Sequence, residues 1–244
     1  EPSARPRFAE AARELVTVVI ARHGGDGLER LPGKAAYITD YGHLASGLTA
    51  AYAALGDPAL VDATIAVVDE AAARLRAPDG GFYTTPAGRD DLFRRSRELV
   101  DNAYPAGQNA LAVALVRLAG ITGDARFVEI ADGIIATSAD IARRAPSATT
   151  TLLAAWRSHQ RGPRTAVITG PPDAALAEAI RAATDPDLLI VDAVAAGDRT
   201  WACLEGRRDL PTSQILVCLG ERCLAPWTSA GLVADGLVTS VSME

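Results

Sequence analysis

The sequence predicts a mainly α protein, a partial (α/α)6 toroid of about three helical hairpins followed by a small C-terminal α/β element. Three observations predict this fold class. Similar amphipathic segments recur in the first two thirds of the chain, more uniformly apolar segments lie between them, and the pattern becomes strand-like after Pro163. We therefore expect an α/α half-toroid over residues 1–162 and an α/β element over residues 163–244.

The recurring amphipathic segments are predicted to be outer helices. Each places apolar residues at helical spacing, with charged residues on the opposite face. Two of them follow similar punctuation, GDP from Gly56 and GDA from Gly123, in which Gly can close one helix and Asp can cap the next. The three segments are RFAEAARELVTVVIA from Arg7, ALVDATIAVVDEAAA from Ala59 and RFVEIADGIIATSAD from Arg126.

The segments between them are predicted to be inner helices, over residues 40–55, 106–119 and 149–159, because their Ala, Gly, Leu and Val content suits a helix packed on several sides. In such an array the loops that enter the inner helices lie together at one end. Two of these loops are long and polar, whereas the turns at the opposite end are tight. Long loops on one face favour a functional site there.

After Pro163 the sequence predicts a βαβ unit followed by further strands. RTAVITG and DLLIVDA are its strands and DAALAEAIRAAT is its helix, with Asp173 as the N-cap, while RTWACLEG and QILVCLGERCLAPW are predicted to add strands. A turn at Gly220 and Glu221 would place Cys218 opposite Cys223. Two reduced structural thiols are the first interpretation of this pair, a redox pair is the second, and a metal site is the least favoured.

Composition and motifs exclude several classes of function. A net charge of −6 argues against nucleic-acid binding, and the Arg, Asp and Glu residues that interrupt the most apolar helical candidates argue against a membrane span. No GxSxG, HExxH, CxxC, GxGxxG or Walker pattern is present, so no cofactor and no metal ion is expected. Three cysteines and no visible signal peptide favour a reducing, cytoplasmic location.

Three residues at the loop end are candidate catalytic groups. Asp40 and His43 lie at the start of a predicted inner helix, where Asp40 can act as a general acid or base with His43 as its partner or as a donor to the substrate. Asp101 is the carboxylate most suited to ligand contact in the second loop. The structural alternative is that both aspartates only stabilise helix amino ends and tie down the loops, and that His43 is a packing residue inside the helix.

Six more residues are predicted to contact a ligand. Carboxamides and tyrosines near a helix start can form a hydrogen-bonding rim for a polyhydroxylated molecule, and Tyr83 can supply a stacking face. The alternative is that they anchor the long loop. The six are Tyr41, Tyr83, Asn102, Tyr104, Gln108 and Asn109.

Several segments together resemble the C-terminal part of the thioredoxin-domain-containing proteins of the spermatogenesis-associated protein 20 type. They are DGGFY, ITDYGHLASGLTAAY, RSRELVDNAYPAGQNALAVALVRLAGITGD and LPTSQILVCLGERCLAPWTS. The resemblance implies a six-hairpin toroid similar to that of N-acylglucosamine 2-epimerases. The sequence departs from the family at PAGQN, which stands where the family has PSGNS, and at Thr151, which stands where an imidazole is expected. The missing imidazole weakens epimerase chemistry.

These observations predict a toroid protein that binds a carbohydrate-like small molecule, with isomerase- or epimerase-type acid–base chemistry if it is an enzyme. The alternative is a non-catalytic interaction module, whose open half-toroid would be completed by another chain or by self-association. A redox role through Cys218 and Cys223 is a third, minor interpretation.

Overall fold

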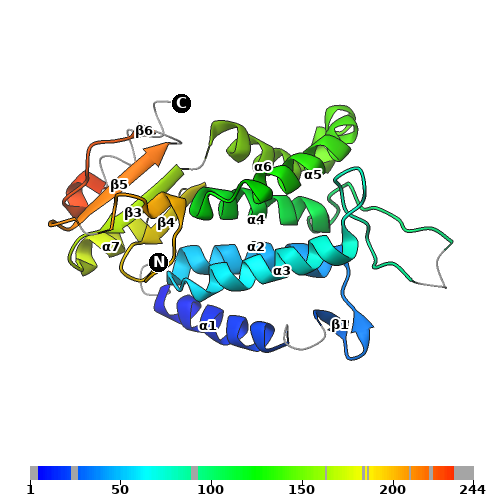
Figure 1. Ribbon diagram of the computed structural model, residues 1–244, viewed down its shortest axis with the longest axis horizontal. Coiled ribbons are helices and arrows are strands. Elements are labelled where there is room, and N and C mark those ends of the chain that lie inside the picture. The colour runs from blue at the N-terminus through cyan, green and yellow to red at the C-terminus, as the bar shows by residue number, and fades with distance from the viewer. Residues whose placement is uncertain are drawn as a thin grey trace.

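The computed structural model describes residues 5–22, 27–88, 93–162, 164–182, 185, 187–208, 210–219 and 222–233. Helices dominate these residues, so the mainly α prediction is confirmed, and Figure 1 shows them beside a small sheet. The helices are α1 (Arg5–Arg22), α2 (Ile38–Leu55), α3 (Ala59–Leu75), α4 (Gly107–Thr122), α5 (Ala125–Arg144), α6 (Thr150–Arg161) and α7 (Ala174–Arg181), with 3-10 turns η2 (Pro146–Ala148) and η3 (Ala202–Leu204). The strands are β1 (Glu29–Leu31), β2 (Lys34–Ala35), β3 (Arg164–Thr169), β4 (Leu188–Asp192), β5 (Gln214–Leu219) and β6 (Arg222–Cys223).

Helix α4 is the centre of the helical layer. It packs against α2 on one side and α6 on the other, while α3 packs on α2 and α5 packs on α4. Its residues Leu111, Leu115 and Leu118 have no exposed surface, which agrees with the prediction that this segment is an inner helix. Helix α6 differs, because Leu152 and Ala155 are its only buried residues. The prediction that the inner helices are packed on several sides is therefore wrong for α6.

The predicted punctuation between helices is confirmed. Gly56 and Gly123 close α2 and α4 in the left-handed conformation, with φ of 70° and 73°. The aspartates that follow accept hydrogen bonds from the first backbone N–H groups of the next helix. Asp57 accepts from the N–H of Ala59 and Asp124 accepts from the N–H of Arg126, both at 3.0 Å. These short turns hold consecutive helices antiparallel.

The amino ends of α2 and α4 meet through two glycines. A Cβ added to Gly107 would lie 2.5 Å from the backbone of Ile38 and Thr39, and one added to Gly42 would lie 1.9 Å from the carbonyl oxygen of Gly107. Only residues without a side chain allow the two backbones to approach so closely. The glycine of the PAGQN segment is therefore a packing requirement.

The small sheet has the strand order β4-β3-β5-β6. Strands β3 and β4 are parallel with α7 between them, so the predicted βαβ unit is confirmed, and Asp173 caps α7 by accepting from the N–H of Leu176 at 3.0 Å. The strand predicted for RTWACLEG is wrong. That segment forms η3, because Trp201 and Leu204 are buried in the core that the helices share, with the Trp201 ring 6.1 Å from that of Tyr52.

One hydrophobic core joins the helices to the inner face of the sheet. Val167, Leu189 and Val191 belong to it, whereas Ala166 and Ile168 face a second cluster under α7. Because successive side chains of β3 lie on opposite faces of the sheet, both faces of this strand are buried. Helix α6 ends at Arg161 and β3 begins at Arg164, but one core contains residues from both parts of the chain, and the division into two domains stays a prediction.

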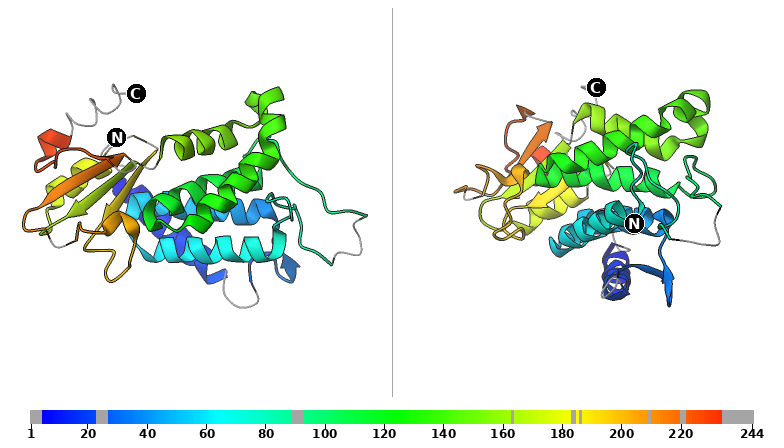
Figure 2. Two further views of the ribbon diagram at one scale, coloured as in Figure 1. Left: turned by 45° about the horizontal axis from the view of Figure 1, so that its top comes forward. Right: turned by 45° about the vertical axis from the view of Figure 1, so that its right-hand side comes forward.

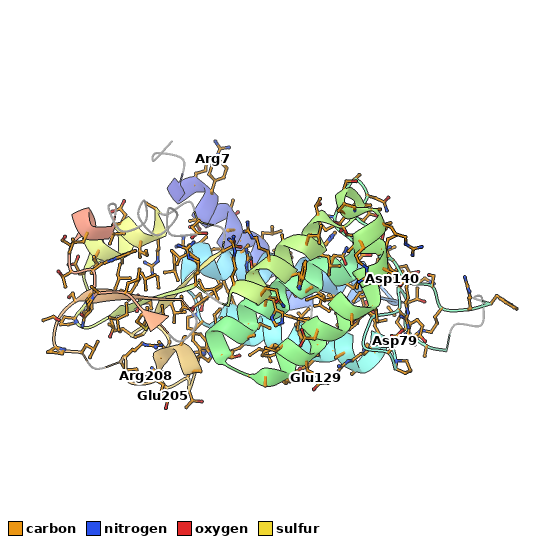
Figure 3. All side chains as sticks on the ribbon, turned by 90° about the horizontal axis from the view of Figure 1, so that it is seen from above. Arg7, Asp79, Glu129, Asp140, Glu205 and Arg208 are labelled. Atoms are coloured by element: carbon orange, nitrogen blue, oxygen red, sulfur yellow. A yellow bond between two sulfur atoms is a disulfide. The ribbon has the colours of Figure 1, made fainter. Side chains whose placement is uncertain are left out.

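The sheet and the long loops lie at opposite ends of the helical layer (Figure 2). Seen from above in Figure 3, Asp79 and Asp140 lie toward the loop end and Glu205 and Arg208 toward the sheet end, while Arg7 projects from α1. In the ranges given above, every helix is too short or too polar to cross a bilayer.

Candidate functional site

The amino ends of α2, α4 and α6 lie at the loop end, as predicted. Asp101 connects two of them, because its carboxylate accepts from the N–H of Ala106 and from that of Thr151, each at 2.9 Å. The loop before α4 also reaches α2, where the N–H of Ile38 donates to the carbonyl of Thr84 at 3.1 Å. Figure 1 shows the starts of α2 and α4 at the same end of the helical layer. Asp40 lies in the first turn of α2 and Asp101 contacts the starts of α4 and α6, so both belong to that end.

Asp101 acts as a shared cap for two helices. Two backbone N–H groups donate to its carboxylate, and its Oδ1 also accepts a hydrogen bond from Nδ2 of Asn109 at 3.0 Å. Burial raises the pKa of Asp101, but hydrogen bonds from Asn109, Thr151 and Ala106 outweigh burial and hold that pKa below its usual value. All of these contacts favour the charged carboxylate, so Asp101 is held as a structural anion.

Asp40, His43 and Tyr104 border one hollow of about 620 Å³ at the start of α2. Asp40 accepts from the backbone N–H of Tyr37 at 2.8 Å, which caps α2, and its carboxylate forms an ion pair with Arg30 at 3.0 Å. About a quarter of the Asp40 side chain remains exposed. A carboxylate oriented in this way can still accept hydrogen bonds from a ligand's hydroxyl groups.

His43 is held in one orientation by its neighbours. Its Nε2 lies 2.9 Å from the carbonyl oxygen of Pro105, and its ring meets that of Tyr104 edge-on at 5.8 Å. A carbonyl only accepts, so Nε2 carries the hydrogen in this contact and Nδ1 is the acceptor of the neutral ring. The half-exposed ring of Tyr104 completes this wall of the hollow.

Three of the predicted ligand-binding residues are buried, and this corrects their assignment. Tyr41 donates to Oε1 of Glu70 at 2.8 Å, and burial is the main cause of its raised pKa. Gln108 accepts from the N–H of Phe82 at 3.2 Å and donates to Ser138. Asn109 holds Asp101. Since none of the three is more than 1% exposed, no ligand reaches them in this conformation.

Tyr83 and Asn102 also lie at the loop end. The Tyr83 ring is covered by arginines, with Cζ of Arg95 at 3.9 Å and Cζ of Arg97 at 5.0 Å from its centre. Its predicted stacking face is therefore occupied. Asn102 is exposed, and its backbone N–H donates to the carbonyl of Tyr104 at 3.0 Å, so it stays a candidate for ligand contact.

Arg30 is the residue at this site that the sequence did not single out. The β1–β2 hairpin places it over Asp40 and 4.5 Å from the ring centre of Tyr37. The hydrogen bond to Asp40 is the main cause of its raised pKa. The sequence feature that could have indicated this hairpin is Pro32-Gly33, a typical turn dipeptide between two charged segments.

The cysteine pair lies at the sheet end. Cys218 and Cys223 are opposite each other on β5 and β6, as predicted, and their sulfurs are bonded, with Cα atoms 3.9 Å apart. This corrects the first interpretation, two reduced thiols, while a redox role stays a prediction. The turn at Gly220 and Glu221 lies outside the described residues. Nowhere in the described part of the chain do three His, Cys, Asp or Glu side chains gather as a metal site would require.

Comparison with known proteins does not identify a family. No protein-family model matches the chain, and no curated protein matches it either. The resemblance to proteins of the spermatogenesis-associated protein 20 type therefore stays a prediction from the sequence.

Proposed function

We propose that the hollow at the loop end binds a carbohydrate-like small molecule, with Asp40 and His43 as its acid–base pair. The observation that carries the proposal is that Asp40, His43 and Tyr104 border the same hollow. A carboxylate and an imidazole suit hydroxyl groups, and an exposed aromatic ring suits the apolar face of a sugar ring. The hollow's volume, about 620 Å³, is in the range of small-molecule sites.

Isomerase- or epimerase-type chemistry needs a base that takes a proton from a carbon atom and an acid that returns one. Nδ1 of His43 is the candidate base, because Nε2 is engaged by Pro105, and once it has taken the proton from carbon the same nitrogen is the acid that returns it. Asp40 lies one helical turn away and is oriented by Arg30. We propose this activity as a second step, to be assayed once sugar binding has been measured.

The partial (α/α)6 toroid belongs to the same proposal. Two features support it: α2 and α4 each pack against the helix that follows, and α4 also lies between α2 and α6. The resemblance noted from the sequence implies the same architecture and a related class of ligand.

Calorimetric titration of the protein with hexoses and N-acetylhexosamines tests the proposal. We expect saturable binding of at least one sugar that weakens about tenfold in Asp40→Asn and His43→Gln, the loss of one or two ligand hydrogen bonds. Asp69→Asn is the matched control, because Asp69 also pairs with an arginine, Arg126, but lies on α3. Equal affinity in Asp40→Asn and Asp69→Asn would exclude the proposed site.

A second candidate function is an interaction module, which an apolar groove favours. The groove has a volume of about 1060 Å³ and lies between α1, α2 and α7. On α1 the nearby Phe8 and Leu15 are 69% and 64% exposed. Contiguous apolar surface of this kind favours a protein partner or a second copy of the chain. Light scattering at micromolar concentration gives the mass, and a monomer that stays monomeric would contradict self-association.

A further inference from the structure

The disulfide between Cys218 and Cys223 lies at the edge of the small sheet. Strand β6, which carries Cys223, is the outermost strand in the order β4-β3-β5-β6. The two cysteines differ in access to solvent, because Cys218 on β5 is 3% exposed whereas Cys223 is exposed. A thiol attacks a disulfide at a sulfur that it can reach, and exposed disulfides exchange most readily. Cys223 is therefore the sulfur of this pair that a dissolved reagent meets first.

Arg207 contacts the exposed sulfur. Its Nη2 donates to Sγ of Cys223 at 3.5 Å. The turn η3 holds the guanidinium there, since Nη1 donates to the carbonyl oxygen of Cys203 at 2.7 Å and the backbone N–H of Arg207 donates to that of Leu204 at 3.0 Å. A fixed cation beside a sulfur stabilises the thiolate, which is the nucleophilic form of cysteine. The buried turn at RTWACLEG thus places a positive charge at Cys223.

The backbone holds the two cysteines together without the S–S bond. Strand β5 pairs with β3 over six residue pairs. Beyond β6 the chain returns to β5, where Ile215 and Trp227 exchange two backbone hydrogen bonds of 2.9 and 3.0 Å. The two cysteines are five positions apart, and a cross-link over so short a segment restrains the unfolded chain less than one that closes a long loop. Breaking the bond should therefore leave both thiols side by side, where they can re-form it.

We propose that this disulfide is a centre of thiol–disulfide exchange with low-molecular-weight thiols. Cys223 is the sulfur that reacts with the small thiol, Cys218 is the resolving cysteine, and Arg207 is a positioning residue that stabilises the Cys223 thiolate. The observation that carries the proposal is the asymmetry of the pair, in which one sulfur is buried and the other is exposed and contacts a guanidinium. The site is independent of the loop-end hollow, because the sheet lies at the other end of the helical layer (Figure 2).

Reduction of the protein takes two exchanges. The thiolate of a small thiol attacks Sγ of Cys223, the bond to Cys218 breaks, and Cys218 leaves with the electron pair and takes up a proton from water. A second thiolate attacks the sulfur of the small thiol in this mixed disulfide, and Cys223 leaves as a thiolate beside Arg207. Two small thiols are thereby oxidised to one small disulfide, and the protein disulfide gains two electrons.

Oxidation of the protein is the reverse sequence. The Cys223 thiolate attacks a small disulfide, which releases one small thiolate and leaves the other half bound to Cys223. Cys218 then loses its proton to water, attacks Sγ of Cys223 and expels the second small thiolate, which restores the protein disulfide. Replacing Cys218 should therefore stop the reaction at the mixed disulfide, and replacing Cys223 should prevent it from starting.

Trapping of the mixed disulfide tests the proposal. The full chain is reduced, freed of reductant and treated with oxidised glutathione, and the adducts are counted by mass spectrometry. We expect one glutathione on Cys223 in Cys218→Ser, formed at least about tenfold faster than any adduct in Cys223→Ser, since Cys218 is buried. The wild-type chain should form its internal disulfide and retain no glutathione. Equal rates in the two variants, or no adduct in Cys218→Ser, would overturn the proposal.

The role of Arg207 is tested in the Cys218→Ser background. Arg207→Gln should slow formation of the Cys223 adduct about threefold, a modest factor because a thiolate that forms more easily is also a weaker nucleophile. Arg207→Lys keeps the charge and should recover most of the rate. Arg143→Gln is the control, because Arg143 is an exposed arginine on α5. Equal rates in Arg207→Gln and Arg143→Gln would overturn the role assigned to Arg207.

Thermal denaturation separates an exchange centre from a purely structural bond. The reduced wild-type chain should unfold cooperatively, with a midpoint no more than about 10 °C below that of the oxidised chain, because the cross-link closes only a short loop. A reduced chain without a cooperative transition would show that the bond holds the fold together, and this result would overturn the proposal.

Discussion

At the scale of single residues, Asp101 shows that one polar group in a sequence can have two interpretations. An aspartate before an apolar helix is a candidate ligand group and also a candidate cap. The structure gives each oxygen protein donors, from Ala106 and Asn109 on one side and Thr151 on the other. What the sequence could not supply is the position of Thr151, which lies 50 residues away and reaches Asp101 only through the packing of α6 on α4.

We predict that Asp101→Ala lowers the free energy of unfolding by about 2–3 kcal/mol, because it removes a cap from α4 and leaves buried donors without an acceptor. Asp140→Ala, an exposed aspartate on α5, should change it by less than about 0.5 kcal/mol. Urea denaturation of the two variants measures the difference. Equal values would show that Asp101 does not hold the helix starts together.

The lowered pKa of Asp101 also predicts an effect of pH. Its folded pKa lies below its unfolded pKa of about 3.9, so its contribution is complete above about pH 5 and is lost as pH falls through the folded value. The stability difference between the protein and Asp101→Asn should therefore be smaller at about pH 3 than at about pH 7. A difference that is constant with pH, measured by urea denaturation, would contradict this account.

The disulfide between Cys218 and Cys223 predicts the number of reactive thiols. Cys203 is the free cysteine, and burial raises its pKa to about 12, so it should react slowly in the folded protein. In concentrated denaturant without reductant, a thiol reagent should find one thiol per chain, and three after reduction. Three thiols before reduction would restore the interpretation of two reduced structural cysteines.

At the scale of elements, periodicity and punctuation predicted the helices well. Each of the six helices predicted before residue 160 begins within two residues of its expected start. The failure at RTWACLEG has a physical cause, because a short apolar segment suits a strand and a buried turn equally well. The segment forms a buried turn because Trp201 packs on Tyr52 of α2, a contact between residues far apart in the chain.

Gly107 at the start of α4 and the exposed Gly47 on α2 provide a matched test of helix packing. Gly107→Ala should destabilise the protein by about 2–3 kcal/mol, because its Cβ would meet the backbone of α2. Gly47→Ala on α2 should stabilise it by about 0.5–1 kcal/mol, because open space surrounds its Cβ and alanine favours a helix. Thermal denaturation measures both. Opposite signs support the close approach of α2 and α4, and equal effects would contradict it.

At the scale of the whole molecule, the sequence could predict the end at which the proposed site lies but not which of the candidate residues are accessible there. Asp40 and His43 both border the hollow at the start of α2. Tyr41 lies on another face, in the buried stripe with Ala45, Leu48 and Tyr52. Burial of that stripe depends on α3 and α4, so the sequence near Tyr41 alone could not show that its hydroxyl would be engaged by Glu70.

The most direct test of the central claim, a ligand site at the start of α2, is a crystal structure of the protein soaked with the sugar that it binds most tightly. The account predicts the sugar within hydrogen-bonding distance of Asp40 and His43, with its ring against Tyr104. A sugar bound elsewhere on the protein, while the Asp40 hollow holds only water, would contradict it.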